Sequence, residues 1–209
     1  MKYSIVYTSK SGNTEKLALA IKESMEGKGE CLQCVKTDVA DYNKISDSEL
    51  VFVGAGSYKG KCDEAAGKFM ETLKNKKVFI FMTVGYGNNQ EYYNKMLNPS
   101  KEFIDSSNNL IGSYACQGQW IEGQKKNLEN ALEKSITEEE KKIVQNKLAN
   151  YENAIGHPNV EDLNKLKATS RDENEYHEKI IKQSGPSKVG IAIICRYAII
   201  YIFYVFLLF

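Results

Sequence analysis

The sequence predicts an α/β fold in which a parallel β-sheet is covered by helices. Two observations support this prediction. Short runs of β-branched and aromatic residues alternate along the chain with stretches whose apolar residues recur at helical spacing. Strands that alternate with helices in this way form parallel sheets with right-handed crossover connections. At 209 residues, the chain is long enough for one ordinary domain and an additional C-terminal segment.

The expected strands are the apolar runs. Tyr3–Tyr7 is the first of them, and it has almost no polar break, which is typical of a strand buried on both faces of a parallel sheet. The other expected strands are residues 31–36, 50–53, 77–82 and 110–116. We therefore predict a sheet of five strands.

Helices are expected between and after these strands. The first begins near Asn13 or Thr14, since the apolar residues that follow recur at helical spacing. In a second helix over residues 64–73, Ala65, Phe69 and Leu73 share one face. Further helical segments are predicted over residues 90–96, 100–104, 125–134, 137–155 and 159–168.

The connection between the first strand and the first helix is rich in hydroxyl groups. The backbone N–H groups at a helix N-terminus are unpaired and favour an anion, and Gly12 lets the backbone approach a ligand closely. The triphosphate-binding pattern GxxxxGK[ST] and the dinucleotide-binding pattern GxGxxG are both absent, so we expect a single terminal phosphate. The expected phosphate-binding residues are Thr8, Ser9, Lys10, Ser11, Gly12, Asn13 and Thr14.

Two further loops follow the ends of expected strands, at residues 54–60 and 83–87. In open α/β sheets the ligand lies beyond the carboxyl ends of the strands, at the topological switch point. We therefore expect both loops to bind the same ligand as the first loop. Their candidate residues are Gly56, Ser57, Tyr58, Lys59 and Gly60, and Thr83, Val84, Gly85, Tyr86 and Gly87.

The stretch IVYTSKSGNTEKLALAI, in which Thr14, Ala18 and Ile21 have the expected spacing, resembles the signature of the flavodoxin family. This resemblance implies a flavodoxin-like three-layer sandwich with strand order 2-1-3-4-5, in which the first, third and fourth strands are neighbours. It also implies FMN as the cofactor, with its phosphate at Thr8–Thr14. Tyr58 is then the first candidate to stack on the flavin ring, and Tyr86 is the second.

Three further segments, GSYKGKCDEA, KVFIFMTVG and YACQGQW, resemble a branch of that family whose members are found beside bilirubin reductases, many of them in anaerobic gut bacteria. In that branch a tryptophan is expected where Tyr58 stands. Stacking on the ring remains open to a tyrosine, but the detailed ring contacts are in doubt. The resemblance covers residues 1–168 and implies a reductase as the redox partner.

The amino-acid composition limits which classes of binding partner are expected. Lys and Arg number 28 against 27 Asp and Glu, so the formal net charge of +1 favours neither nucleic acid nor a generally acidic partner. Electron-shuttling flavodoxins tend to be strongly acidic, and this neutral balance weakens the interpretation as a simple carrier. We predict no side-chain catalytic residue and no metal ligand, because no dyad and no ligand spacing is present.

Cysteine usage indicates a reducing compartment. The five cysteines are an odd number and no secretory pattern opens the sequence, which together predict a cytoplasmic protein. Cys31 and Cys34 form a CxxC motif inside the expected second strand, whereas redox-active CxxC motifs lie at a helix N-terminus. We interpret them as strand residues, with a redox motif as the alternative.

Three functional hypotheses follow. The first is an FMN-binding redox protein that transfers electrons to a reductase or as part of a reductase system. The second is a flavin reductase linked to NAD(P)H or menaquinone that acts directly on a quinone or tetrapyrrole. The third is a structural subunit that has lost FMN, against which the hydroxyl-rich loop at Thr8–Thr14 argues.

The C-terminal end differs from the rest. Residues 169–188 are expected to be a polar linker, and residues 189–209 are apolar apart from Arg196. A stretch of this length spans a bilayer core of about 30 Å, so one interpretation is an anchor that tethers the protein to the inner face of the plasma membrane. The other is an artefact of the gene end, because the flavodoxin resemblance stops well before it.

Overall fold

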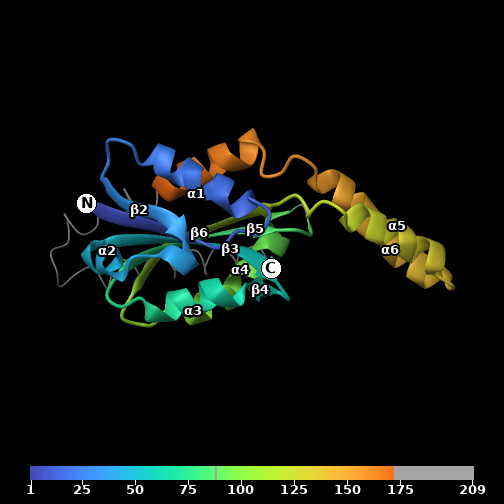
Figure 1. Cartoon of the computed structure of the whole chain (residues 1–209), viewed down its shortest axis with the longest axis horizontal. Coiled ribbons are helices and arrows are strands. Elements are labelled where there is room, and N and C mark those ends of the chain that lie inside the picture. The colour runs from blue at the N-terminus through green and yellow to red at the C-terminus, as the bar shows by residue number, and fades with distance from the viewer. Residues whose placement is uncertain (88, 172–209) are drawn as a thin grey trace, which may run out of the picture. The chain divides into compact units, whose positions relative to one another are not determined.

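The computed structural model describes residues 1–87 and 89–171, and these form the predicted α/β architecture (Figure 1). Met1–Ser170 form one compact unit. The predicted tail at 189–209 and nearly all of the predicted linker lie outside the described residues. Within the described part of the chain, no helix has both the length and the apolar character needed to cross a membrane.

The six strands of the described sheet are β1 (Lys2–Tyr7), β2 (Glu30–Lys36), β3 (Leu50–Tyr58), β4 (Lys61–Cys62), β5 (Lys77–Val84) and β6 (Asn109–Gln117). Five of them are parallel neighbours in the order β2-β1-β3-β5-β6, while the short β4 pairs antiparallel with β3 off this path. The predicted order 2-1-3-4-5 is confirmed for the five long strands. The small sixth strand was not predicted.

The helices are α1 (Asn13–Ser24), α2 (Tyr42–Asp47), α3 (Glu64–Thr72), α4 (Gln90–Leu97), α5 (Gln124–Lys134) and α6 (Glu138–Ala154). Short 3-10 turns occupy Thr37–Val39 and Asn98–Phe103. The chain is helical again over residues 160–171, which we call the final described helix. It begins with reciprocal hydrogen bonds, from Asp162 N–H to Asn159 Oδ1 at 3.0 Å and from Asn159 N–H to Asp162 Oδ2 at 2.9 Å.

The loop predicted at residues 54–60 is wrong for most of its length, because β3 continues through it to Tyr58. A two-residue turn at Lys59 and Gly60 then leads into β4, with φ angles of 49° and 85°. Positive φ at both central residues is the geometry that joins two antiparallel strands in a tight hairpin. A short β-hairpin therefore projects beyond the carboxyl end of the sheet.

The core lies in two layers, one on each face of the sheet. One layer packs α1 and Leu166 of the final described helix against side chains such as Ile5 and Phe81. The other packs α3 and Leu97 of α4 against side chains such as Val53 and Ile80. Figure 1 shows α1 and α3 on opposite sides of the strands. These two layers fix the positions of the strand ends, where the connecting loops meet.

The buried face of α3 differs from the prediction. Phe69 and Leu73 are buried as expected, but Ala65 is exposed and its neighbour Ala66 takes the core position. Asp63 caps this helix by accepting a hydrogen bond from the backbone N–H of Ala66 at 3.2 Å. Ala65 instead lines the cavity described below.

A helical hairpin, α5 and α6, is inserted between β6 and the final described helix. Thr137 and Glu140 form a capping box at the start of α6, with each side chain bonded to the backbone of the other residue. No residue of α5 is buried, and in α6 only Ala154 is. The hairpin therefore adds little to the core, and its contacts with the strand ends are the part that bears on the site.

Candidate functional site

A cavity of about 520 Å³ lies at the carboxyl ends of the parallel strands. Its volume falls within the range of about 300–1,000 Å³ that is typical of sites for small molecules and cofactors. The predicted residues that line it are Thr8, Ser9, Lys10, Ser11, Asn13 and Thr14 from the first connection, Gly56, Ser57 and Tyr58 from the β3–β4 hairpin, and Thr83 and Gly85 from the end of β5. The cavity therefore lies at the edge of the sheet where the switch-point rule expects a ligand.

Six predicted residues do not line the cavity. Gly12 is the N-cap of α1, while Lys59 and Gly60 form the turn of the hairpin. Val84 is buried in the core. Tyr86 and Gly87 face elsewhere: the Tyr86 ring lies 6.0 Å from that of Tyr92, and the Gly87 N–H donates to Asn150 Oδ1 at 3.0 Å.

The β1–α1 connection offers unpaired backbone donors. Gly12 is the N-cap of α1 with φ of 84°, and it supplies no side chain to cap the helix. Among the described residues, no hydrogen bond is donated by the backbone N–H groups of residues 9–14. The positive end of the α1 dipole adds to these donors, so the connection can bind one anionic group.

Asp63 joins this connection to the β3–β4 hairpin. Its Oδ2 accepts a hydrogen bond from Thr8 Oγ1, and a second from the backbone N–H of Gly56 at 3.3 Å. The Thr8 hydroxyl is thus directed to a carboxylate of the protein, while Thr8 itself lines the cavity. Asp63 also lines the cavity, and it was not predicted to do so, because its position before a helix is the only local signal that it carries.

Two aromatic side chains line the cavity from strands on either side of β5. Tyr58, at the end of β3, is 58% exposed, and the Lys59 ammonium lies 5.3 Å from the centre of its ring. Trp120 follows β6, and its indole Nε1 donates to the carbonyl oxygen of Gly85. Flat apolar surfaces of this kind suit a planar ring system. Trp120 was not predicted, although QGQW directly follows a predicted strand.

Small residues and amides fix the segment that contains Trp120. Asn13 Nδ2 donates to the carbonyl oxygen of Gln119 at 2.7 Å, which joins the start of α1 to this segment. A Cβ at Gly118 would lie 3.0 Å from Asn13 Nδ2 and 3.1 Å from Thr83 Cβ, so a larger residue there would force these side chains to shift. Thr14 Oγ1 lies 2.9 Å from Thr83 Oγ1, and both side chains are buried. Asn13 and Thr14 therefore hold the cavity walls together.

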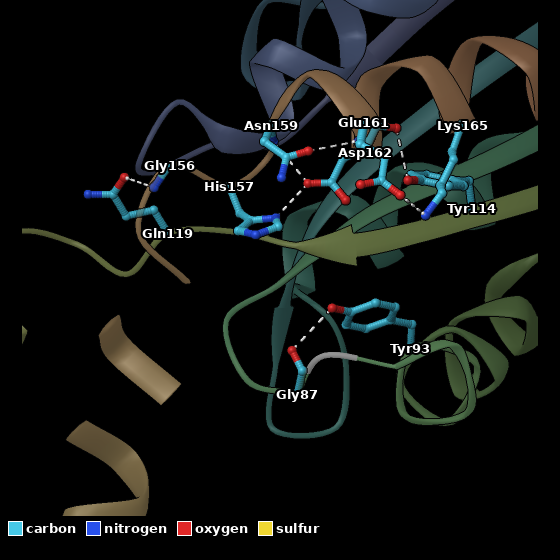
Figure 2. A network of polar contacts seen from close by, with 10 residues as sticks. All are labelled: Gly87, Tyr93, Tyr114, Gln119, Gly156, His157, Asn159, Glu161, Asp162 and Lys165. Atoms are coloured by element: carbon cyan, nitrogen blue, oxygen red, sulfur yellow. Dashed lines mark hydrogen bonds and ion pairs between the residues drawn. The ribbon is translucent and has the colours of Figure 1, made fainter. Parts of the chain in front are cut away.

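A network of polar contacts that includes Gln119 also stabilises the segment that contains Trp120 (Figure 2). Gln119 Oε1 accepts from the Gly156 N–H at 3.0 Å, and His157 Nδ1 lies 2.6 Å from Asp162 Oδ2. On the other side, Tyr93 Oη donates to the Gly87 carbonyl at 3.1 Å. Burial raises the pKa of Tyr93 to about 12, so this hydroxyl keeps its proton.

Cys31 and Cys34 lie on β2, as predicted, and both are half-buried against the core layer under α1. Burial raises the pKa of Cys34 to about 11. A redox-active CxxC motif needs a thiol with a lowered pKa, so this environment favours the interpretation as packed strand residues.

A family model described as a flavodoxin domain matches residues 4–171, which is most of the chain. The chain belongs to the flavodoxin family. The family predicted from the first strand, loop and helix is thereby confirmed, and FMN is the cofactor that membership of this family implies. The cavity is lined by the hydroxyl-rich connection after β1 and by the aromatic side chains of Tyr58 and Trp120.

Two curated relatives of this flavodoxin-family chain are similar over most of their length. A flavodoxin-like domain-containing protein BilS from Clostridioides difficile is 28% identical over 170 residues, covering 78% of this chain and 90% of the relative. A protein of the same name from Clostridium symbiosum is 27% identical over 176 residues, with the same shares covered. Among solved structures, oxidised flavodoxin 1 from Bacillus cereus has a TM-score of 0.43 at 14% identity, covering 74% of this chain and 99% of its own.

Proposed function

We propose that this protein binds FMN in the cavity and transfers electrons to a partner reductase. The observation that supports FMN most strongly is that one cavity is lined both by the β1–α1 connection, whose backbone N–H groups at residues 9–14 donate no hydrogen bond within the described part of the chain, and by the aromatic side chains of Tyr58 and Trp120. Unpaired donors at a helix N-terminus suit a phosphate, and aromatic faces suit an isoalloxazine ring. The absence of both nucleotide motifs from the sequence agrees with a single phosphate.

The residues take separate roles in this proposal. The backbone N–H groups of residues 9–14 bind the phosphate, and the hydroxyl of Ser11 and the ammonium of Lys10 lie in the same connection. Tyr58 and Trp120 orient the ring, while Asp63 holds the two connections in register through Thr8 and Gly56. FMN, when bound, supplies the electron-transfer chemistry.

The residues at the rim of the cavity favour electron transfer to a partner protein over the direct reduction of a small substrate. Tyr58 and Ile121 line the cavity and are 58% and 54% exposed, so apolar surface at its edge is open to a docking protein. The carboxylate of Asp63 is already bonded to Thr8, Gly56 and Ala66, and is therefore a poor candidate for a proton-transferring base.

The most specific part of the proposal is the class of reductase that accepts the electrons. The sequence resembles flavodoxin-like proteins found beside bilirubin reductases, and the two BilS relatives support that placement. We propose a reductase that acts on a tetrapyrrole as the electron acceptor.

Electron transfer without independent turnover is the expected result of a kinetic test. FMN-loaded protein, reduced with dithionite and freed of excess reductant, should be reoxidised stoichiometrically by ferricyanide. The same protein mixed with NADH or NADPH and a quinone should show no sustained oxidation of the nicotinamide, because the dinucleotide-binding pattern GxGxxG is absent from the sequence. Sustained NAD(P)H oxidation in the absence of a second protein would favour the direct reductase instead.

A further inference from the structure

We propose that α6 is a positioning element for the Trp120 wall of the cavity, acting through Asn150 and Tyr151. This inference rests on the proposed function, since its consequence is for FMN affinity. It assigns a role to the inserted helical hairpin, which contributes almost nothing to the hydrophobic core.

Asn150 is the first point of contact between α6 and the strand ends. Its Nδ2 donates to the Gly85 carbonyl at 2.9 Å, and its Oδ1 accepts from the Gly87 N–H at 3.0 Å. The same Oδ1 accepts from Gln117 Nε2 at 3.4 Å. One amide side chain therefore ties the connection after β5 to the end of β6, and both of its polar atoms are used.

The Gly85 carbonyl links Asn150 to Trp120. It accepts hydrogen bonds from both Asn150 Nδ2 and Trp120 Nε1, which occupies the two lone pairs of the oxygen. A Cβ at Gly85 would lie 2.8 Å from the same indole nitrogen, so the ring sits directly against the backbone. The position of the indole thus depends on where Asn150 holds Gly85.

Tyr151 supports the indole from a second direction. Its ring lies 6.4 Å from the ring of Trp120, centre to centre, at an interplanar angle of 90°. Such an edge-to-face pair is a favourable geometry that restricts how far the indole can rotate. Two consecutive residues of α6 therefore fix Trp120. Asn150 acts through the Gly85 carbonyl, to which both side chains donate, and Tyr151 contacts the indole ring directly.

The same contacts explain why Tyr86 is not a wall of the cavity. Asn150 holds the Gly87 N–H, and the Tyr86 ring lies against Tyr92 on α4. The connection after β5 is turned toward α6 and α4, and the aromatic surface is supplied by the connection after β6 instead.

Trp120 is the single tryptophan of the chain, so intrinsic tryptophan fluorescence reports on this wall alone. The experiment compares full-length protein, stripped of flavin, with Asn150→Ala and with the control Asn146→Ala, an exposed asparagine one turn earlier on α6. A second pair compares Tyr151→Ala with Tyr151→Phe, which keeps the ring. Emission wavelength and acrylamide quenching are measured first, circular dichroism melts verify folding, and FMN is then titrated into each variant.

We expect Asn150→Ala and Tyr151→Ala to shift Trp120 emission to longer wavelength, increase quenching and raise the FMN Kd by about tenfold, the size of effect typical for losing such contacts. Asn146→Ala and Tyr151→Phe should match the wild type. If Asn150→Ala fails to fold, the comparison of Tyr151→Ala with Tyr151→Phe tests the inference by itself.

Unchanged emission and quenching in both alanine variants would overturn the inference. Altered fluorescence with an unaltered FMN Kd would also contradict it, since the wall would then not contribute to binding. A wild-type protein that binds no FMN would refute the proposed function, while the fluorescence comparison would still report on whether α6 positions Trp120.

Discussion

Replacing Gly12 with aspartate is expected to weaken FMN binding by about 100-fold or more. The new carboxylate would lie beside the unpaired N–H groups of residues 9–14, where the phosphate is proposed to bind. Two unit charges 4 Å apart interact by about 4 kcal/mol at an effective dielectric constant of 20, and each 1.4 kcal/mol is a factor of ten in affinity. The measurement is the FMN Kd at low and at physiological salt.

Asparagine at the same position is the matched control. Gly12 has a φ of 84°, which asparagine tolerates better than most residues, and a Cβ there would meet no atom within 4 Å. Gly12→Asn has nearly the shape of Gly12→Asp without its charge, so its Kd should stay within about tenfold of the wild type. Equal losses in both variants would attribute the effect to the backbone and would contradict a phosphate at this loop.

Replacing Gly54 with alanine should destabilise the fold by about 3 kcal/mol, the upper part of the usual range for overpacking a core. Gly54 lies in β3 directly opposite Tyr7 of β1 and Phe81 of β5. A Cβ there would lie 2.4 Å from two carbons of the buried Phe81 ring and 2.8 Å from Tyr7 Cβ. The expected Tm decrease in a thermal melt is about 10 °C.

Gly56, two residues further along the same strand, provides the control for this change. A Cβ at Gly56 would have nothing within 4 Å, and its φ is not positive. Gly56→Ala should therefore keep or slightly raise the Tm, because alanine lowers the conformational entropy of the unfolded chain. A Gly54→Ala variant as stable as Gly56→Ala would show that the sheet relaxes around the added methyl group.

Local sequence was sufficient for the elements with a strong apolar pattern. The five long strands and α1 could be predicted because their residues, such as Ile5 and Leu17, are buried in regular succession. By contrast, α2 was missed because Ile45 is its only buried residue, which leaves no periodic signal. The extension of β3 was missed because Gly54, Ala55 and Gly56 resemble a loop in composition, although Gly54 is needed there to make room for Phe81.

The site was predictable in outline but not in its aromatic wall. The hydroxyl-rich connection directly follows a buried parallel strand, so it emerges at the carboxyl edge of the sheet, where the cavity lies. Trp120 lies there because of contacts with Gly85 and Tyr151, each more than thirty positions away in the sequence. Asp63 likewise reaches the cavity through Thr8, which is distant in the chain. Such contacts depend on tertiary packing and leave no local pattern.

A calorimetric titration of full-length protein with FMN and, separately, with riboflavin is the most direct test. Riboflavin has the same ring and ribityl chain but lacks the phosphate. Loss of several charge-assisted hydrogen bonds, each contributing about 1.5–3 kcal/mol, predicts one FMN per chain and riboflavin binding weaker by about 100-fold or more. Equal affinity for the two compounds, or no heat of binding with FMN, would contradict the account.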